Sequence, residues 1–315
     1  MPFSILRRSL LFFLSICLAS LLPQSAVAWG NDGHQMVNQA AVQRLPAAMP
    51  AFLKKAEAQI IYLGPEPDRW RAKDDAFVKN AQEPDHFIDL ELLDGMTLPP
   101  GRYAYLKMMY AKAAATGDNR YLPDHVGLQP YITMEIFDRL KVAFREYRRL
   151  EAAGESTAPA EFNAIFYAGW LGHYVADGAN PMHTTVNYNG WVGPNPKGYG
   201  TDRRLHYKFE TAFVEDNITE ADFAPLVKAP EELADPFQDY IAYLRASNKL
   251  VPELYELDKQ HAFDVAGTKA GKKFVALRLA AGTQMLLDLW YTAWVESAQP
   301  GHDTYVPPRL PRKEK

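Results

Sequence analysis

Apolar residues recur every three or four positions in the longest segments of this 315-residue chain. That spacing places them on one face of an α-helix, whereas a half-buried strand alternates apolar and polar residues. Proline and glycine separate the segments, as expected for helices joined by irregular loops. The sequence therefore predicts an all-α fold. The clearest apolar faces comprise Val37, Ala40, Ala41 and Leu45; Ile132, Ile136, Phe137, Leu140 and Phe144; Phe166, Tyr167, Trp170, Leu171 and Tyr174; and Phe274, Leu277, Leu279, Met285, Leu286 and Trp290.

The first 28 residues have the pattern of a secretory signal peptide. Arg7 and Arg8 precede an apolar run from Leu10 to Leu22, and Ala26-Val27-Ala28 forms a small-residue cleavage site. The apolar run is short for a bilayer span, which takes about 20 residues. We therefore expect a secreted or periplasmic protein that begins at Trp29 and has no transmembrane segment after cleavage.

Cleavage at this site determines which metal ligands the mature chain can offer. It removes Cys17, the only cysteine, and changes the formal net charge from −4 to −6 because Arg7 and Arg8 are lost. A metal site must then use histidine, carboxylate and backbone groups, a donor set that suits zinc. The mild acidity argues against a large duplex-binding surface, but it does not exclude an enzyme that takes one or two nucleotides at a metal centre.

No Gly/Ser linker, low-complexity tract or repeat divides the mature chain. We therefore expect a single domain over residues 29–306, followed by a flexible tail at residues 307–315 that is rich in proline and basic residues. Residues 187–204 predict a long surface loop, where Asn, Gly and Pro alternate with aromatic residues. The aromatic side chains of this loop either stack on a substrate or cover a helix end.

Histidine and acidic residues recur at metal-ligand spacing. His173 and Asp177 are four residues apart and share one helix face, and His206 and Glu210 repeat that spacing. His183 follows Pro181, which should end the first helix and turn the chain back toward the same site. One such pair is usually a surface ion pair, but two pairs with a histidine between them indicate a metal centre.

These residues resemble the zinc-dependent phospholipase C / S-one and P-one nuclease superfamily. The segments that carry the resemblance are His173-Tyr-Val-Ala-Asp177, Asn180-Pro181-Met182-His183 and His206-x-x-x-Glu210, the predicted N-terminal Trp29 followed by His34, and Pro84-Asp85-His86-Phe87-Ile88-Asp89 with Asp68 before it. The resemblance covers most of the mature chain. It implies a secreted all-α enzyme with three Zn²⁺ ions.

The resemblance also implies a ligand set for each ion. The first zinc would take Asp68, His86, His173 and Asp177; the second His183, His206 and Glu210; and the third the Trp29 amine and carbonyl, His34 and a bridging Asp177. Asp74 and Asp75 are alternatives to Asp68. The remaining histidines, His125, His261 and His302, have no matching partner and are expected to be surface or capping residues.

For catalysis, the resemblance implies hydrolysis of a phosphate diester by a metal-activated water. Arg71, from an Asp-x-x-Arg pattern, would bind the phosphate, and Asp177 would bridge two metals. A helical protein with structural zinc only, or an inactive relative, is the alternative to an enzyme. No stable protein partner is evident.

Two substrate classes remain open, single-stranded nucleic acid and a phosphatidylcholine-like lipid. Features of the nucleases are the Asp68-x-x-Arg71 pattern, the short Trp29 to His34 spacing, the long His183 to His206 spacing, and Phe87 with Asp89, which would stack on and hydrogen-bond a base. Features of the phospholipases are Glu210, where the nucleases usually have Asp, and Pro181-Met182-His183. The sequence favours a nuclease that lacks the disulfides of fungal members.

Overall fold

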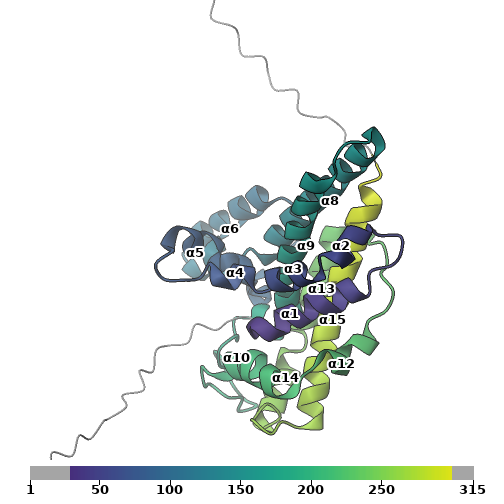
Figure 1. The fold of residues 1–315 in the computed structure, drawn as a ribbon. Coiled ribbons are helices and arrows are strands. Elements are labelled where there is room, and N and C mark those ends of the chain that lie inside the picture. Colours follow the sequence, from purple (N-terminus) through teal and green to yellow (C-terminus); the bar gives the residue numbers. More distant parts are fainter. Residues whose placement is uncertain (1–28, 300–315) are drawn as a thin grey trace, which may run out of the picture.

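The computed structural model describes residues 29–299, and helices are the regular elements of this part of the chain (Figure 1). The all-α prediction is confirmed. The predicted signal peptide, Cys17, His302 and the predicted tail lie outside the described residues. Between residues 29 and 299, no helix has the combination of length and apolarity that would let it span a membrane.

The α-helices are α1 Gly30–Gln43, α2 Ala51–Lys55, α3 Glu57–Leu63, α4 Glu66–Arg69, α5 Ala76–Gln82, α6 Arg102–Thr116, α7 Pro123–Val126, α8 Gln129–Ala153, α9 Ala158–Ala179, α10 Leu205–Tyr207, α11 Phe213–Asn217, α12 Glu220–Phe223, α13 Pro236–Asn248, α14 Val251–Lys259 and α15 Lys269–Glu296. The short 3₁₀ turns are η1 Glu83–His86, η2 Leu90–Leu93, η3 Asn119–Tyr121, η4 Pro181–His183 and η6 Ala224–Leu226, and η5 Lys208–Ala212 is a π-helical turn.

Four of these helices cover the segments whose apolar spacing predicted a helix, namely α1, α8, α9 and α15. Prolines stand in the first turns of α8 and α9, where a missing backbone N–H leaves no hydrogen bond unmade. Helix α9 ends at Ala179, two residues before Pro181, as predicted. The segment after Tyr207 differs from a regular helix, because the π turn η5 carries Glu210.

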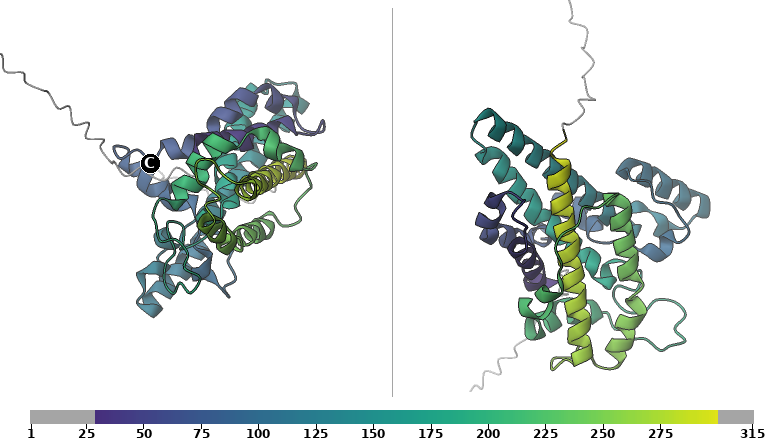
Figure 2. Two further views of the ribbon diagram at one scale, coloured as in Figure 1. Left: turned by 90° about the horizontal axis from the view of Figure 1, so that it is seen from below. Right: turned by 90° about the vertical axis from the view of Figure 1, so that its right-hand side faces the viewer.

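Helix α9 is the central helix of the structure. It packs against α8, α15, α1 and α3, and its C-terminal half from Leu171 to Ala179 is buried. Helix α15 runs the length of the molecule beside it, in yellow in the right view of Figure 2. Side chains on the C-terminal half of α9 are therefore enclosed by other helices and shielded from water.

The contact between α1 and α9 depends on a buried amide and a glycine. Asn38 of α1 donates Nδ2 hydrogen bonds to the carbonyl oxygens of Ile60, at 2.8 Å, and Gly169, at 3.1 Å. A Cβ at Gly172 would lie 1.8 Å from Asn38 Oδ1. Only glycine at this position lets α1 approach α9 closely enough to place His34 beside His173.

We expect Gly172→Ala to lower the free energy of unfolding by about 2–3 kcal/mol, because the added methyl group overpacks the contact with Asn38. Urea denaturation of the zinc-loaded protein measures this loss. Gly101→Ala is the matched control, since a Cβ there has no heavy atom within 4 Å and Gly101 has an ordinary φ of −95°. Equal stability of the two variants would contradict this account of the helix contact.

The aromatic residues of the loop over residues 187–204 divide between the two roles that the sequence left open: some cover a helix, and one lies near the candidate site. Trp191 and Tyr199 pack against Tyr255 of α14, with ring centroids 5.2 and 5.4 Å from the Tyr255 ring. Tyr188 is half exposed, and its ring centroid lies 6.2 Å from that of His206. Most of the loop therefore covers α14, and Tyr188 faces the candidate site.

Candidate metal centre

Eight predicted ligand side chains come together from separate elements. They are His34 on α1, Asp68 on α4, His86 on η1, His173 and Asp177 on α9, His183 on η4, His206 on α10 and Glu210 on η5. Each is buried, with a side-chain exposure of 7% or less. Polar side chains at this depth need partners, and they form three groups that could hold a metal ion: His34, Asp68 and His173; His86, His173 and Asp177; and His183, His206 and Glu210.

Asp177 lies where the groups meet. Its Oδ2 atom is 3.2 Å from His86 Nδ1, 3.4 Å from His173 Nε2 and 3.8 Å from His183 Nδ1. Its Oδ1 atom is 3.5 Å from His34 Nε2. One carboxylate therefore faces four histidine rings, as expected for a group that bridges two metal ions.

Carbonyl oxygens fix the tautomers of the histidines around Asp177. A carbonyl oxygen only accepts hydrogen bonds, so His173 Nδ1 donates to Gly64 O at 2.9 Å, and His86 Nε2 donates to Gln82 Oε1 at 2.5 Å. His183 Nδ1 likewise donates to the His86 carbonyl oxygen at 2.7 Å. When such a ring is neutral, its other nitrogen carries a lone pair, which is the form that binds a metal.

In these tautomers, nitrogen atoms that carry lone pairs lie close together with no hydrogen atom between them. His86 Nδ1 and His173 Nε2 lie 3.0 Å apart, and both face the Asp177 carboxylate. Two nitrogen ligands on one tetrahedral zinc lie about 3.3 Å apart, given Zn–N distances near 2.05 Å. The residues therefore fit a cation with a preference for nitrogen and oxygen donors, and zinc is such a cation.

The pKa shifts agree with this donor set for two of the histidines, whereas the negative charges of Asp177 and Glu210 outweigh burial at His183 and raise its pKa to about 9. Burial lowers the pKa of His86 and His173 well below the usual value, which keeps both rings neutral. Burial also raises the pKa of Asp177 well above its usual value and that of Asp68 to about 7. Buried carboxylates of this kind need positive charge nearby, and a metal ion supplies it.

Glu210 is the centre of the third group. Its Oε2 atom lies 2.8 Å from His206 Nε2 and 3.4 Å from His183 Nε2, and Asn180 donates an Nδ2 hydrogen bond to it at 2.9 Å. Burial acts to raise the pKa of Glu210, but the charge of His206 and hydrogen bonds from both histidines lower it to about 2. Glu210 is therefore an ionised carboxylate.

Trp29 lies against the same carboxylate. Its backbone nitrogen is 3.2 Å from Glu210 Oε2, and its indole Nε1 donates to the Ala176 carbonyl oxygen at 2.6 Å. The ring is fully buried against Phe209. The indole therefore anchors the predicted N-terminus of the mature protein beside the metal ligands.

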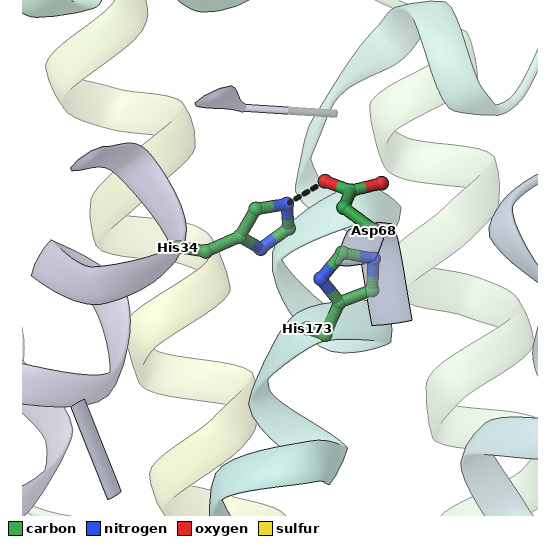
Figure 3. A group of neighbouring side chains, drawn as sticks. All are labelled: His34, Asp68 and His173. Carbon is green, nitrogen blue, oxygen red and sulfur yellow. Dashed lines mark ion pairs between the residues drawn. The ribbon is translucent and has the colours of Figure 1, made fainter. Parts of the chain in front are cut away.

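His34 lies close to Asp68 as well as to Asp177. Its ring stacks on that of His173 at a centroid distance of 4.0 Å, and its Nε2 atom is 3.9 Å from Asp68 Oδ2 (Figure 3). Between the possible acidic ligands, the geometry favours Asp68, because Asp74 and Asp75 are exposed. Arg71 Nη1 pairs with Asp68 Oδ1 at 3.3 Å.

The sequence analysis missed the side chains that hold the ligands in place. Gln82 holds His86 and Asn180 holds Glu210. Gln82 stands four residues before His86, a helical spacing that could have indicated it. The contact from Asn180 spans 30 residues, and no sequence spacing indicates it.

We expect Gln82→Met to weaken zinc binding by about 10–100-fold, because His86 loses the acceptor that fixes its tautomer and orientation. Competition with a chromophoric zinc chelator measures the affinity. Lys79→Met on the same helix is the control, since Lys79 is outside the metal groups among the described residues. Unchanged affinity in Gln82→Met would show that Gln82 does not orient His86.

A pocket of about 380 Å³ lies over these groups. It is lined by Arg71, Glu83, His86, Phe87, Asp89, Asp124, His125, Met182, His183, Tyr188 and His206. The predicted substrate residues Arg71, Phe87 and Asp89 therefore share one pocket with three metal-group histidines. His125 and His261 are both exposed, as surface residues are; His125 also lines the pocket, whereas His261 pairs with Asp264.

Asp89 is a nearly buried carboxyl group on the pocket wall. Burial, with a contribution from the like charge of Glu91, raises its pKa to about 7. Because the folded-state pKa lies above the unfolded value near 3.8, ionisation of Asp89 costs no stability below about pH 4. The cost grows as the pH rises from about 4 to about 7 and is constant above that.

We therefore expect Asp89→Asn to raise the free energy of unfolding by about 2 kcal/mol at pH 8 and to leave it unchanged near pH 4. Urea denaturation at both values measures the difference. Asp94→Asn is the control, because Asp94 is exposed. A gain of the same size at both values would show that the effect does not come from ionisation of Asp89.

No family model matches the chain. A probable serine protease from Bradyrhizobium tropiciagri is 27% identical over 228 residues, which is 61% of this chain and about a quarter (27%) of that protein's length. Among solved structures, the alpha toxin of Clostridium absonum shares 15% identity at a TM-score of 0.40, covering 87% of this chain and 67% of that one.

The alpha-toxin of an avian Clostridium perfringens strain is similar to the same degree, with 15% identity and a TM-score of 0.37 over 87% of this chain and 66% of that one. TM-scores below 0.5 assign neither an activity nor a substrate. The geometry of the site is therefore the basis for assigning a function to this chain.

Proposed function

We propose that this chain is a secreted zinc-dependent hydrolase of phosphate diesters. The observation that carries the proposal is the convergence of lone-pair nitrogens and buried carboxylate oxygens around Asp177, at the base of a pocket that also contains Arg71. Zinc bound there would lower the pKa of a water molecule and neutralise the phosphate oxygens. The three groups support up to three ions, of which one would also use the free amine of Trp29.

The chain's own residues then have separate tasks. Asp68 holds Arg71 by an ion pair, which directs a guanidinium group at the phosphate. Asp177 and Glu210 balance the charge of the bound ions. The indole of Trp29 fixes the amine beside Glu210, so removal of the signal peptide would complete the site.

The acidic and aromatic residues of the pocket favour a substrate with a cationic group. Glu83, Asp89 and Asp124 line it together with the rings of Phe87 and Tyr188. Carboxylates and aromatic faces attract an ammonium group, and the carboxylates repel the neighbouring phosphates of a nucleic acid. This charge pattern favours a phosphatidylcholine-like lipid, the alternative of the sequence analysis, over its preferred nuclease.

One observation favours single-stranded nucleic acid as a second candidate. Phe87 is half-buried and lines the pocket with Asp89, whose carboxyl group has a pKa of about 7. A ring that stacks and a carboxyl group that donates or accepts a hydrogen bond can recognise a base. Rates of hydrolysis measured on a lipid and on a nucleic acid distinguish the two candidate substrates.

We expect the zinc-loaded protein beginning at Trp29 to hydrolyse short-chain phosphatidylcholine at least about tenfold more efficiently, in kcat/KM, than heat-denatured DNA. The reason is that the acidic residues that line the pocket discriminate through charge. Released phosphocholine and acid-soluble nucleotides are measured, and a chelated sample should be inactive on both.

The Glu83→Gln variant tests whether negative charge in the pocket contributes to substrate binding. It should raise KM for phosphatidylcholine by about 3–10-fold with kcat nearly unchanged, because it removes attraction for the headgroup and leaves the metal ligands intact. Faster hydrolysis of DNA than of lipid by the wild-type protein would reverse the choice of substrate. Hydrolysis that persists without zinc would overturn the proposal as a whole.

A further inference from the structure

His125 is the pocket histidine that the metal groups leave unused. Four histidines line the pocket, and three of them, His86, His183 and His206, belong to those groups in the described part of the chain. The side chain of His125 is 53% exposed, so it stands at the mouth of the pocket and not among the buried ligands. The leaving group of a substrate departs from a pocket of this kind through its mouth.

Backbone hydrogen bonds hold His125 on the pocket wall. Helix α7, which carries it, is joined to the segment around His86 by Asp89 N to Val126 O at 2.7 Å and by Leu128 N to Pro84 O at 2.7 Å. The two segments therefore form one rigid wall, and the position of His125 is set by the same backbone that places His86.

Gly127 makes this close approach possible. Its φ is +98°, in the region that favours glycine, and a Cβ there would lie 2.0 Å from the Phe87 carbonyl oxygen. A side chain at this position would push α7 away from the pocket. This backbone arrangement keeps α7, which carries His125, against the segment that carries Phe87.

The surroundings of His125 are mainly acidic. Asp124 Oδ2 lies 4.0 Å from His125 Nε2, and Glu83 and Asp89 line the same pocket, in which Arg71 is the one lysine or arginine among the lining residues. Histidine is the residue that most often transfers protons in catalysis, because its ordinary pKa lies near neutrality. An imidazolium group among carboxylates can serve as a proton donor.

We propose that His125 is the general acid that protonates the leaving oxygen of the diester, a role that rests on the proposed hydrolase function. Water oxygen forms a bond to phosphorus, and the bond from phosphorus to the leaving oxygen breaks. The leaving oxygen keeps that electron pair and takes the N–H proton of the His125 imidazolium. The proton of the attacking water passes to solvent, and the neutral His125 regains a proton from solvent.

Two substrates with one headgroup test this role. Short-chain phosphatidylcholine releases an alkoxide, which needs a proton, whereas p-nitrophenyl phosphorylcholine releases a phenolate that is stable without one. His125→Ala should lower kcat on the lipid by about 100-fold or more and on the p-nitrophenyl ester by less than about threefold. If the hydrolysed diester is a nucleotide, a dinucleotide and a p-nitrophenyl nucleotide ester form the same pair.

His261→Ala is the matched control, because His261 also pairs with a nearby aspartate but lies outside the pocket lining. Zinc content and circular dichroism establish that His125→Ala folds, and His125→Gln provides a second variant. Equal losses on both esters, or no loss on the lipid, would overturn the general acid. Absence of hydrolysis by the wild-type protein on either class of substrate would overturn the proposed function instead.

Discussion

The contact between Asp177 and four histidine rings is the interaction on which the site depends. Helix α9 brings this carboxylate into the buried centre of the structure, where an isolated charge is costly. Rings from α1, η1 and η4 reach it from other parts of the chain. A metal ion bound between these atoms would stabilise the fold, and folding would bring its ligands together.

The polar contacts around this centre also explain how separate segments keep their positions. Asn38 joins α1 to α9, the indole of Trp29 bonds to α9, and backbone hydrogen bonds join α7 to the segment that carries His86. Each contact is short and buried, and two of the close approaches require glycine. The pocket therefore has a fixed wall, and its lining combines three histidines of the metal groups with carboxylates and aromatic rings.

Local sequence predicted the features that depend on short spacing. Apolar periodicity predicted α1, α8, α9 and α15, and Pro181 predicted the end of α9. His173 with Asp177 and His206 with Glu210 were recognised because residues four apart share one helix face. The absence of cysteine after residue 28 and the pattern of the first residues limited the ligands to nitrogen and oxygen donors.

The tertiary structure decided what depends on contacts between distant residues. It placed His34 near Asp68 and Asn180 against Glu210. Glu210 itself lies in a π turn, which its four-residue spacing from His206 does not distinguish from an ordinary helix. It also brought His125 into the pocket through hydrogen bonds between α7 and a segment about 40 residues earlier. Sequence spacing determines which side chains share a helix face, but only the packing of helices determines which faces meet.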